Sequence, residues 1–193
     1  MNYTDAQLIS RTETHAEGFD GWEKGIYDIW VRAPRNPQNV DIFLDKVYTF
    51  NVPEKGATPE FRMVCTGTSL TGSWALKNFH QYNKYGAAIL KSNQFVRNSH
   101  FYDFHKGYRA YRQGKNFPFY RDGDSDLIPE ENGTINKTDI IAANCHRANE
   151  KAVSTRNYNW SAACLVRNSP NQFRAWLAYM SGRPLSVAIL QQF

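Results

Sequence analysis

The sequence has few cysteines and no long apolar run, and each absence excludes a class of protein. Its three cysteines, Cys65, Cys145 and Cys164, show no Cys-x-x-Cys spacing. This excludes a disulfide framework or a cysteine-based zinc cluster and leaves at least one free thiol. No apolar stretch approaches the roughly 20 residues that a membrane-spanning helix needs. We therefore expect no membrane span.

The sequence also lacks an export signal and internal repeats. Its first 19 residues do not combine a basic start with an apolar core, so we expect no signal peptide and synthesis in the cytoplasm. A chain of 193 residues with 41% hydrophobic composition and no long linker can bury one sizeable core. We predict a single domain over residues 1–193, with residues 1–24 as an N-terminal helix and lead-in and 25–193 as the main domain.

The charge is mildly positive but not concentrated. The net charge is +5, and the lysines and arginines are scattered. A basic face favours anionic partners, although a mixed, solvated surface explains the same composition. Residues 95–120 interleave aromatic and basic side chains, as single-stranded nucleic-acid platforms do. Strands with one wet face carry the same pattern, so we do not expect a nucleic-acid partner.

Local patterns predict a mostly β protein with two or three helices. Thr4-Asp5-Ala6-Gln7 is typical of a helix start, which predicts a helix over residues 4–14. Apolar residues at helical spacing predict a second helix of about ten residues around 173–180. β-branched, aromatic and apolar runs bounded by turn residues predict strands at 25–32, 41–50, 61–65, 86–90, 140–145 and 185–190.

His146 and Cys164 form the pair with the most chemical content. The apolar run 140–145 predicts a buried strand that ends at His146, and a polar loop then leads to Cys164. A nearby imidazole can take the proton of a thiol and so make it a nucleophile. The backbone N–H groups of Ala162, Ala163 and Cys164 could stabilise the charge of a tetrahedral intermediate. A buried cysteine used as a small hydrophobe and a structural histidine explain the same residues.

The arrangement of strand, His146, loop, Ser161-Ala162-Ala163-Cys164, helix and final strand resembles the L,D-transpeptidase catalytic domain. The signature of that family is a histidine followed about sixteen residues later by Ser-His-Gly-Cys, with an arginine two residues after the cysteine. The resemblance is strongest over 138–193, where residues 171–177 and 181–189 match the family's helix, Gly-x-Pro turn and closing strand. Upstream, 61–68 is similar to the family's strand ending in Ser/Thr-Thr-Gly.

The resemblance implies a fold and a set of roles. The fold would be a β-sandwich or mixed sheet, with Cys164 as nucleophile and His146 as general base. His105 would be a second histidine beside the thiol, Arg147 or Arg167 would hold a substrate carboxylate, and Trp160 and Ser161 would line the substrate site. The substrate would be the stem peptides of peptidoglycan, which would be hydrolysed or cross-linked, and we expect no cofactor.

Three departures from the signature leave a second interpretation open. Ala162 replaces the histidine, Ala163 replaces the glycine, and Arg167 lies three positions after the cysteine. If the glycine position needs a positive φ, alanine there costs on the order of 1 kcal/mol. The chain would be a divergent branch of the family, or the same fold used as a non-catalytic wall-binding or virion structural module. Because enzymes of this class are exported, the missing signal favours delivery by other means, such as a bacteriophage lysis or virion protein.

A run of carboxylates raises a separate possibility. Asp122, Asp124 and Asp126 stand at every second position, as in the first half of a calcium-binding loop. Leu127 and Gly133 then stand where that loop needs glycine and a bidentate glutamate. An Asp-rich turn is the alternative, and we predict no metal.

Overall fold

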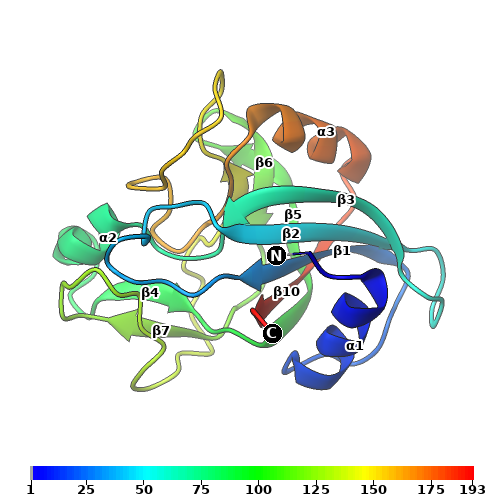
Figure 1. Ribbon diagram of the computed structural model, residues 1–193, viewed down its shortest axis with the longest axis horizontal. Coiled ribbons are helices and arrows are strands. Elements are labelled where there is room, and N and C mark those ends of the chain that lie inside the picture. Colours follow the sequence, from blue (N-terminus) through cyan, green and yellow to red (C-terminus); the bar gives the residue numbers. More distant parts are fainter. Residues whose placement is uncertain (1) are drawn as a thin grey trace.

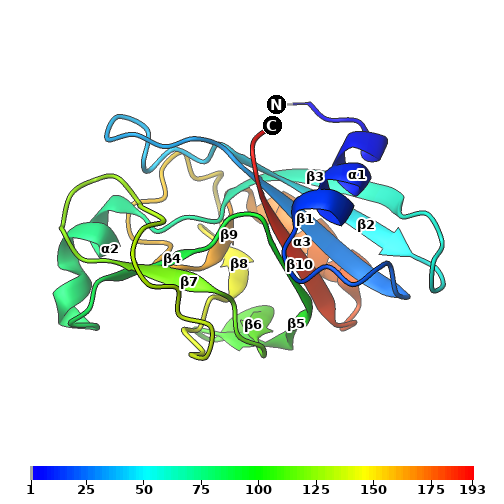
Figure 2. The ribbon, with the colours of Figure 1, turned by 90° about the horizontal axis from the view of Figure 1, so that it is seen from below.

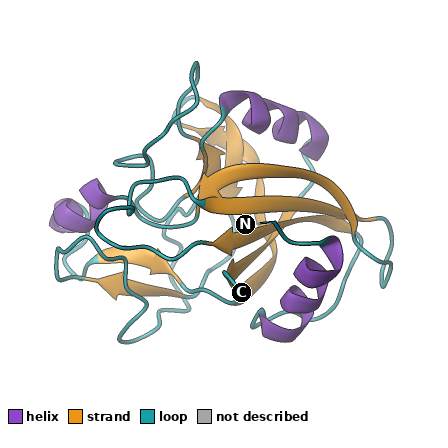
Figure 3. Cartoon of the chain, viewed as in Figure 1, coloured by secondary structure: helices purple, strands orange, loops and turns teal. Residues whose placement is uncertain are grey.

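A closed ring of eight strands forms the body of the molecule in the computed structural model, which describes residues 2–193 (Figures 1 and 3). The strand order around the ring is β1-β10-β5-β6-β8-β9-β3-β2. Two of its pairings, β1 with β10 and β8 with β9, are parallel, and the others are antiparallel. The predicted mostly β, mixed sheet is confirmed, and the sheet closes on itself into a barrel. The strands are β1 (Gly25–Arg32), β2 (Asp45–Val52), β3 (Glu60–Thr68), β5 (Gln94–His105), β6 (Tyr108–Gln113), β8 (Cys145–Arg147), β9 (Leu165–Arg167) and β10 (Leu185–Gln191).

Two of the helices follow the predicted ranges closely. α1 (Asp5–His15) begins with a capping box, in which the Thr4 side chain accepts from the Gln7 N–H and the Gln7 side chain accepts from the Thr4 N–H. α3 (Pro170–Met180) begins at a Ser169 cap followed by proline. No helix within residues 2–193 is long and apolar enough to cross a membrane.

The barrel sheet has two differently covered faces. One face packs against α3, and we call it the α3 face; its cluster includes Trp30, Tyr111 and Trp176. Over β1, the other face packs against α1 through Leu8, Tyr27 and neighbouring apolar residues. Figure 1 shows α3 and α1 on opposite sides of the curved strands. Because side chains alternate along a strand, each strand residue belongs to one face only.

A smaller unit lies beside the barrel (Figure 2). It consists of β4 (Ala87–Leu90) paired with β7 (Phe119–Asp122), and of α2 (Ser73–Asn78), which continues into a 3₁₀ turn at Phe79–Gln81. Its apolar cluster joins Leu70, Leu76, Phe79 and Ile89. The short helix α2 was not predicted, because six residues are too few for a periodic pattern to stand out.

The predicted strand over 140–145 is wrong for most of its length, because β8 begins at Cys145. Ala142 has a φ of 56°, which a strand does not accommodate. Side chains take over the hydrogen bonds of this segment: Gln113 accepts from the Ala143 N–H, and His100 Nε2 donates to the Ala143 oxygen at 2.7 Å. The backbone is therefore satisfied without a strand partner.

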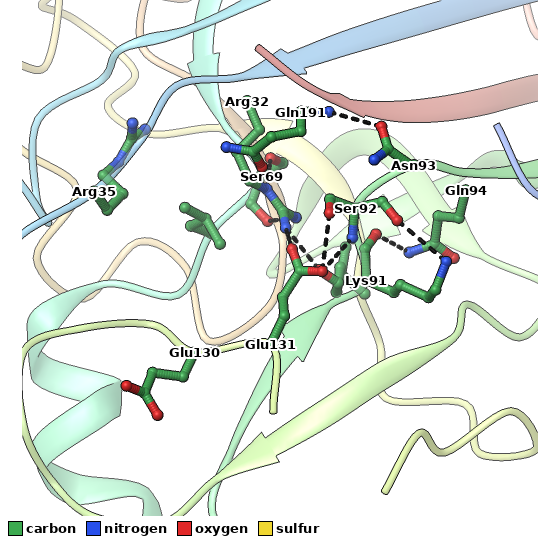
Figure 4. A network of polar contacts seen from close by, with 12 residues as sticks. Arg32, Arg35, Ser69, Lys91, Ser92, Asn93, Gln94, Glu130, Glu131 and Gln191 are labelled. Carbon is green, nitrogen blue, oxygen red and sulfur yellow. Dashed lines mark hydrogen bonds and ion pairs between the residues drawn. The ribbon is translucent and has the colours of Figure 1, made fainter. Parts of the chain in front are cut away.

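The loop between β7 and β8 is held to the barrel by a buried charge network (Figure 4). The Arg32 guanidinium, whose side chain is 3% exposed, pairs with Glu131 at 2.5 Å. The second carboxylate oxygen of Glu131 accepts from the N–H and the hydroxyl of Ser92, each at 2.9 Å. Arg32 also donates to the Ser69 hydroxyl at 3.0 Å. Residue 131 of the loop is thus fixed against the end of β1.

Candidate functional site

The two short parallel strands β8 and β9 bring His146 and Cys164 to one face of the sheet. Cys145 pairs with Leu165, and His146 pairs with Val166. The Leu165 N–H donates to the Asn144 oxygen at 2.9 Å, which extends this register back by one residue. Cys164 and His146 therefore share a face, on neighbouring strands and two positions apart in register. This face is the one opposite α3, where Cys164 packs on the cluster that contains Val166.

The loop before Cys164 is held by close backbone contacts. The Ser161 hydroxyl donates to the Cys164 oxygen at 2.8 Å, and the Ser161 oxygen accepts from the Gly72 N–H at 2.9 Å. A Cβ at Gly72 would lie 2.0 Å from the Tyr158 oxygen. Only glycine allows this approach, so Gly72 fixes the position of the cysteine loop.

His146 is oriented by its own backbone neighbour. Its Nδ1 lies 2.7 Å from the Arg147 oxygen, a contact in which the ring N–H donates. The Tyr108 hydroxyl lies 3.3 Å from both Nδ1 and this oxygen. With the proton on Nδ1, Nε2 carries the free lone pair. Nε2 is buried and has no hydrogen-bond partner within residues 2–193.

A second imidazole lies against the first. The His105 ring stacks on the His146 ring with centroids 4.4 Å apart and planes at 16°. The Asn144 side-chain amide lies 3.2 Å from His105 Nδ1 and donates to it. The structure therefore places His105 next to His146, while its role in chemistry stays a prediction.

Cys164 and His146 are both neutral at rest. Burial raises the pKa of the Cys164 thiol to about 11, against smaller lowering effects of the Asn144 N–H and the Lys106 charge. Burial, followed by the proximity of His105, lowers the pKa of His146 to about 3. The Sγ of Cys164, which is half-buried, donates to the Ala142 oxygen at 3.4 Å. A thiol and a neutral imidazole are thus favoured over a thiolate–imidazolium pair.

Two strained alanines flank the thiol. Ala142, which accepts the thiol hydrogen bond, has a φ of 56°, and Ala163, which precedes Cys164, has a φ of 117°. Alanine has no polar side chain to stabilise a left-handed conformation, so each position stores on the order of 1 kcal/mol. Ala163 occupies the glycine position of the Ser-His-Gly-Cys signature, and its φ is positive there. Strain of this kind is concentrated at functional sites.

The backbone N–H groups near Cys164 differ in availability. The Ala163 N–H points to the Ser161 hydroxyl at 3.3 Å. Within residues 2–193, no acceptor takes the N–H of Ala162 or of Cys164. These two groups are therefore the free donors of the predicted set.

Two cavities lie next to these residues, and neither is lined by Cys164 itself. A cavity of 290 Å³ is lined by His146, Arg147, Tyr108 and Trp160, among others. The Arg147 guanidinium lies 4.1 Å above the Tyr108 ring. A second cavity of 650 Å³ is lined by Ala142 and Ala162, with residues from β7 and the β7–β8 loop. His146 thus lines the first cavity, and Ala142, which accepts the thiol hydrogen bond, lines the second.

Arg167 does not belong to this site, so its predicted role as a carboxylate holder is wrong. It lies three positions after Cys164, and alternation places it on the α3 face. There it is fully buried, pairs with Asp28, donates to the Cys145 sulfur at 2.7 Å and lies 3.8 Å above the Trp176 ring. An arginine two positions after the cysteine would have shared the cysteine's face.

The aspartate run forms local turns. The Asp124 and Asp126 side chains accept from N–H groups two residues later, at 3.0 and 2.5 Å, and Asp122 accepts from the Glu130 N–H. Burial raises the pKa of Asp122 to about 6. No group of three or more metal-ligating side chains comes together in the described part of the chain.

Three further residues at this site were not singled out from the sequence: Tyr108, Asn144 and Arg121. Tyr108 and Asn144 lie beside the histidines through non-local contacts, and Arg121 lines the second cavity. No family model, curated protein or solved structure matches the chain. The geometry of the site and the signature resemblance therefore carry the functional argument.

Proposed function

We propose that the protein is a cysteine-dependent acyl-transfer enzyme that acts on the stem peptides of peptidoglycan. The observation that carries this proposal is the free Nε2 of His146, on the same face as Cys164 and one strand away. The Arg147 carbonyl fixes the ring in the tautomer that a general base needs. The resemblance to the L,D-transpeptidase signature supplies the substrate class.

In the proposed reaction, the Cys164 sulfur attacks a peptide carbonyl carbon while His146 Nε2 takes the thiol proton. Because both groups are neutral at rest, the proton moves during the attack and not before it. The N–H groups of Ala162 and Cys164 stabilise the oxyanion, an effect of roughly 3 kcal/mol per donor. His146 then gives the proton to the leaving amine. Water releases the acyl group as a hydrolysis product, whereas a second amine forms a cross-link.

Arg147 and Trp160 would bind part of the substrate in the cavity next to His146. His105 would hold the His146 ring in place by stacking on it, while its proximity lowers the pKa of His146 and so makes His146 a weaker base. Peptidoglycan would then be the partner, and virion proteins would be further partners that bring the enzyme to the wall.

The test is a digest of purified peptidoglycan with wild-type protein, Cys164→Ala and Cys65→Ala. We expect soluble muropeptides from wild type and Cys65→Ala and none from Cys164→Ala. Cys65 is a buried thiol on the α3 face, so it controls for the loss of any cysteine. Equal release by Cys164→Ala would remove the thiol from the mechanism.

A non-catalytic wall-binding or virion structural module is the second candidate. Its specific support is the raised pKa of Cys164 together with a thiol that donates to a backbone carbonyl. Ala162 in place of the signature histidine points the same way. Titration of the thiol by alkylation rate discriminates between the two. An alkylation profile that is identical in wild type and His146→Ala would favour the module.

A further inference from the structure

A groove runs along the smaller sheet from Ala142, whose oxygen accepts the hydrogen bond of the Cys164 thiol. The 650 Å³ cavity that begins at Ala142 and Ala162 continues into one of 760 Å³. The two cavities share four lining residues, Asn83, Arg121, Thr138 and Asp139, so they form one continuous groove. Its far end is lined by residues 132–137 of the β7–β8 loop.

Arg121 lies in the middle of this groove with little to neutralise it. Its guanidinium donates to the Gly86 oxygen at 3.2 Å and lies 4.8 Å above the Phe119 ring. Within residues 2–193, no carboxylate lies within 4.0 Å of it. Because Arg121 is half-buried, water screens its charge only in part, and no carboxylate of the described residues neutralises it within salt-bridge distance.

The nearest acid in the groove is already engaged. The Asp139 carboxylate accepts from the Asn136 side-chain amide at 2.7 Å and from the Thr138 hydroxyl at 3.3 Å. Burial lowers the pKa of Arg121, and Asp139 acts on it only at longer range. The planar guanidinium therefore keeps donors that can grip a carboxylate in two-point fashion.

The part of the β7–β8 loop that lines the groove is held in place by several contacts. Asn136 forms a β-bridge with Phe119, two residues before Arg121. The Asn116 side chain donates to the Thr138 oxygen at 2.6 Å, and Glu131 fixes the start of the loop to Arg32. The wall that faces Arg121 is thus tied to β1 of the barrel through Glu131 and to β7 and the β6–β7 connection through Asn136 and Thr138.

We propose that Arg121 binds a carboxylate of a peptide lying along this groove, with the peptide's scissile carbonyl at Cys164. This rests on the proposed function for the reaction but not for the binding. Arg121 takes the role that the sequence assigned to Arg167. The ligand class is an acidic, extended peptide whose carboxylate lies on the Ala142 and Ala162 side of the thiol.

The test measures binding and turnover separately. Isothermal titration of Cys164→Ala protein uses a stem tetrapeptide with a free carboxy-terminus and the same peptide as its amide. We expect the acid to bind about tenfold or more tightly than the amide. Adding Arg121→Gln should abolish that preference, and Arg121→Lys should restore part of it. The exposed Arg62→Gln is the matched control and should leave the preference intact.

The outcomes separate the two proposals. A preference that survives Arg121→Gln, or no preference in the parent, overturns the carboxylate site. Preference that depends on Arg121 in a protein without peptidoglycan activity keeps the site and overturns the enzyme. Turnover by wild type that Arg121→Gln leaves unchanged for both peptides keeps the enzyme and overturns the site.

Discussion

The two faces of the β8–β9 pair each carry a cysteine and a basic side chain, in opposite circumstances. On the α3 face, Cys145 accepts from Arg167, and Asp28 balances the charge in a fully buried cluster. On the other face, Cys164 is half-buried and His146 keeps an unpartnered nitrogen. The β8–β9 pair therefore carries a closed, charge-balanced cluster on one face, and on the other a half-buried thiol and an imidazole nitrogen without a hydrogen-bond partner in residues 2–193. Substitutions on the two faces should separate stability from activity.

The largest expected effect is on activity, from His146→Gln. Loss of a general base lowers turnover by about 10²–10⁴-fold, while glutamine keeps a polar group of similar length at the site. We expect peptidoglycan digestion to fall by this amount, with the urea midpoint little changed. Unchanged digestion would transfer the base role to another residue, and His105→Gln is the next variant to measure.

Asp28→Ala should be the largest effect on stability. It leaves the Arg167 charge buried without its partner, and breaking such a pair lowers the free energy of unfolding by about 3–5 kcal/mol. Asp103→Ala breaks the exposed Arg112 pair instead and should lower it by less than about 1 kcal/mol. Urea unfolding curves give both values. Similar losses for both variants would contradict the contrast between the buried and exposed pairs.

Acid should destabilise the fold through its buried histidines. Burial lowers the pKa of His100 to about 4, so the folded state keeps it neutral while an unfolded histidine titrates near 6.5. Its contribution is full above pH 6.5, is lost progressively as the pH falls from 6.5 to 4, and amounts to on the order of 3 kcal/mol. His100→Gln should flatten the stability profile between these values. The exposed His80→Gln should leave the slope unchanged.

The strained alanines predict a smaller, matched difference. Ala142 and Ala162 are both exposed and line the same cavity, but only Ala142 has a positive φ. Glycine relieves strain at 142 and only adds unfolded-state freedom at 162. Ala142→Gly should therefore be more stable than Ala162→Gly by about 1.5 kcal/mol in thermal or urea unfolding. Equal stability of the two variants would show that Ala142 is not strained.

Elements with strong local signals could be predicted from the sequence. Three examples are the Thr4–Gln7 capping box, the apolar strand at 25–32 and the helical repeat from Phe173 to Met180. In each, the residues that determine the element are close together in the sequence. The segment 140–144 could not be predicted, because its backbone partners are side chains distant in sequence, including Gln113 and His100. The closure of the sheet depends on the β6–β8 and β3–β9 pairings, which no local pattern records.

The part of the site that depends on which segments are neighbours could be predicted. The part that depends on which face of a strand a side chain takes could not. His146 and Cys164 share a face because consecutive short segments form neighbouring parallel strands. The role predicted for Arg167 was wrong because Arg167 lies three and not two positions after Cys164, which places its side chain on the opposite face of the sheet. Arg121 has no sequence neighbour in the site, so only the folded chain brings it to the groove.

The shortness of β8 and β9 has a consequence for how the ring holds together. Each has three residues, and β8 meets β6 through the single pair Tyr111–Cys145. This seam is where the ring would open first, and its amide hydrogens should exchange with solvent sooner than those of β1 and β2. Because His146 lies on β8 and Cys164 directly precedes β9, a molecule that bridges their side chains would tie β8 to β9 and leave the β6–β8 pair as the place where the ring opens.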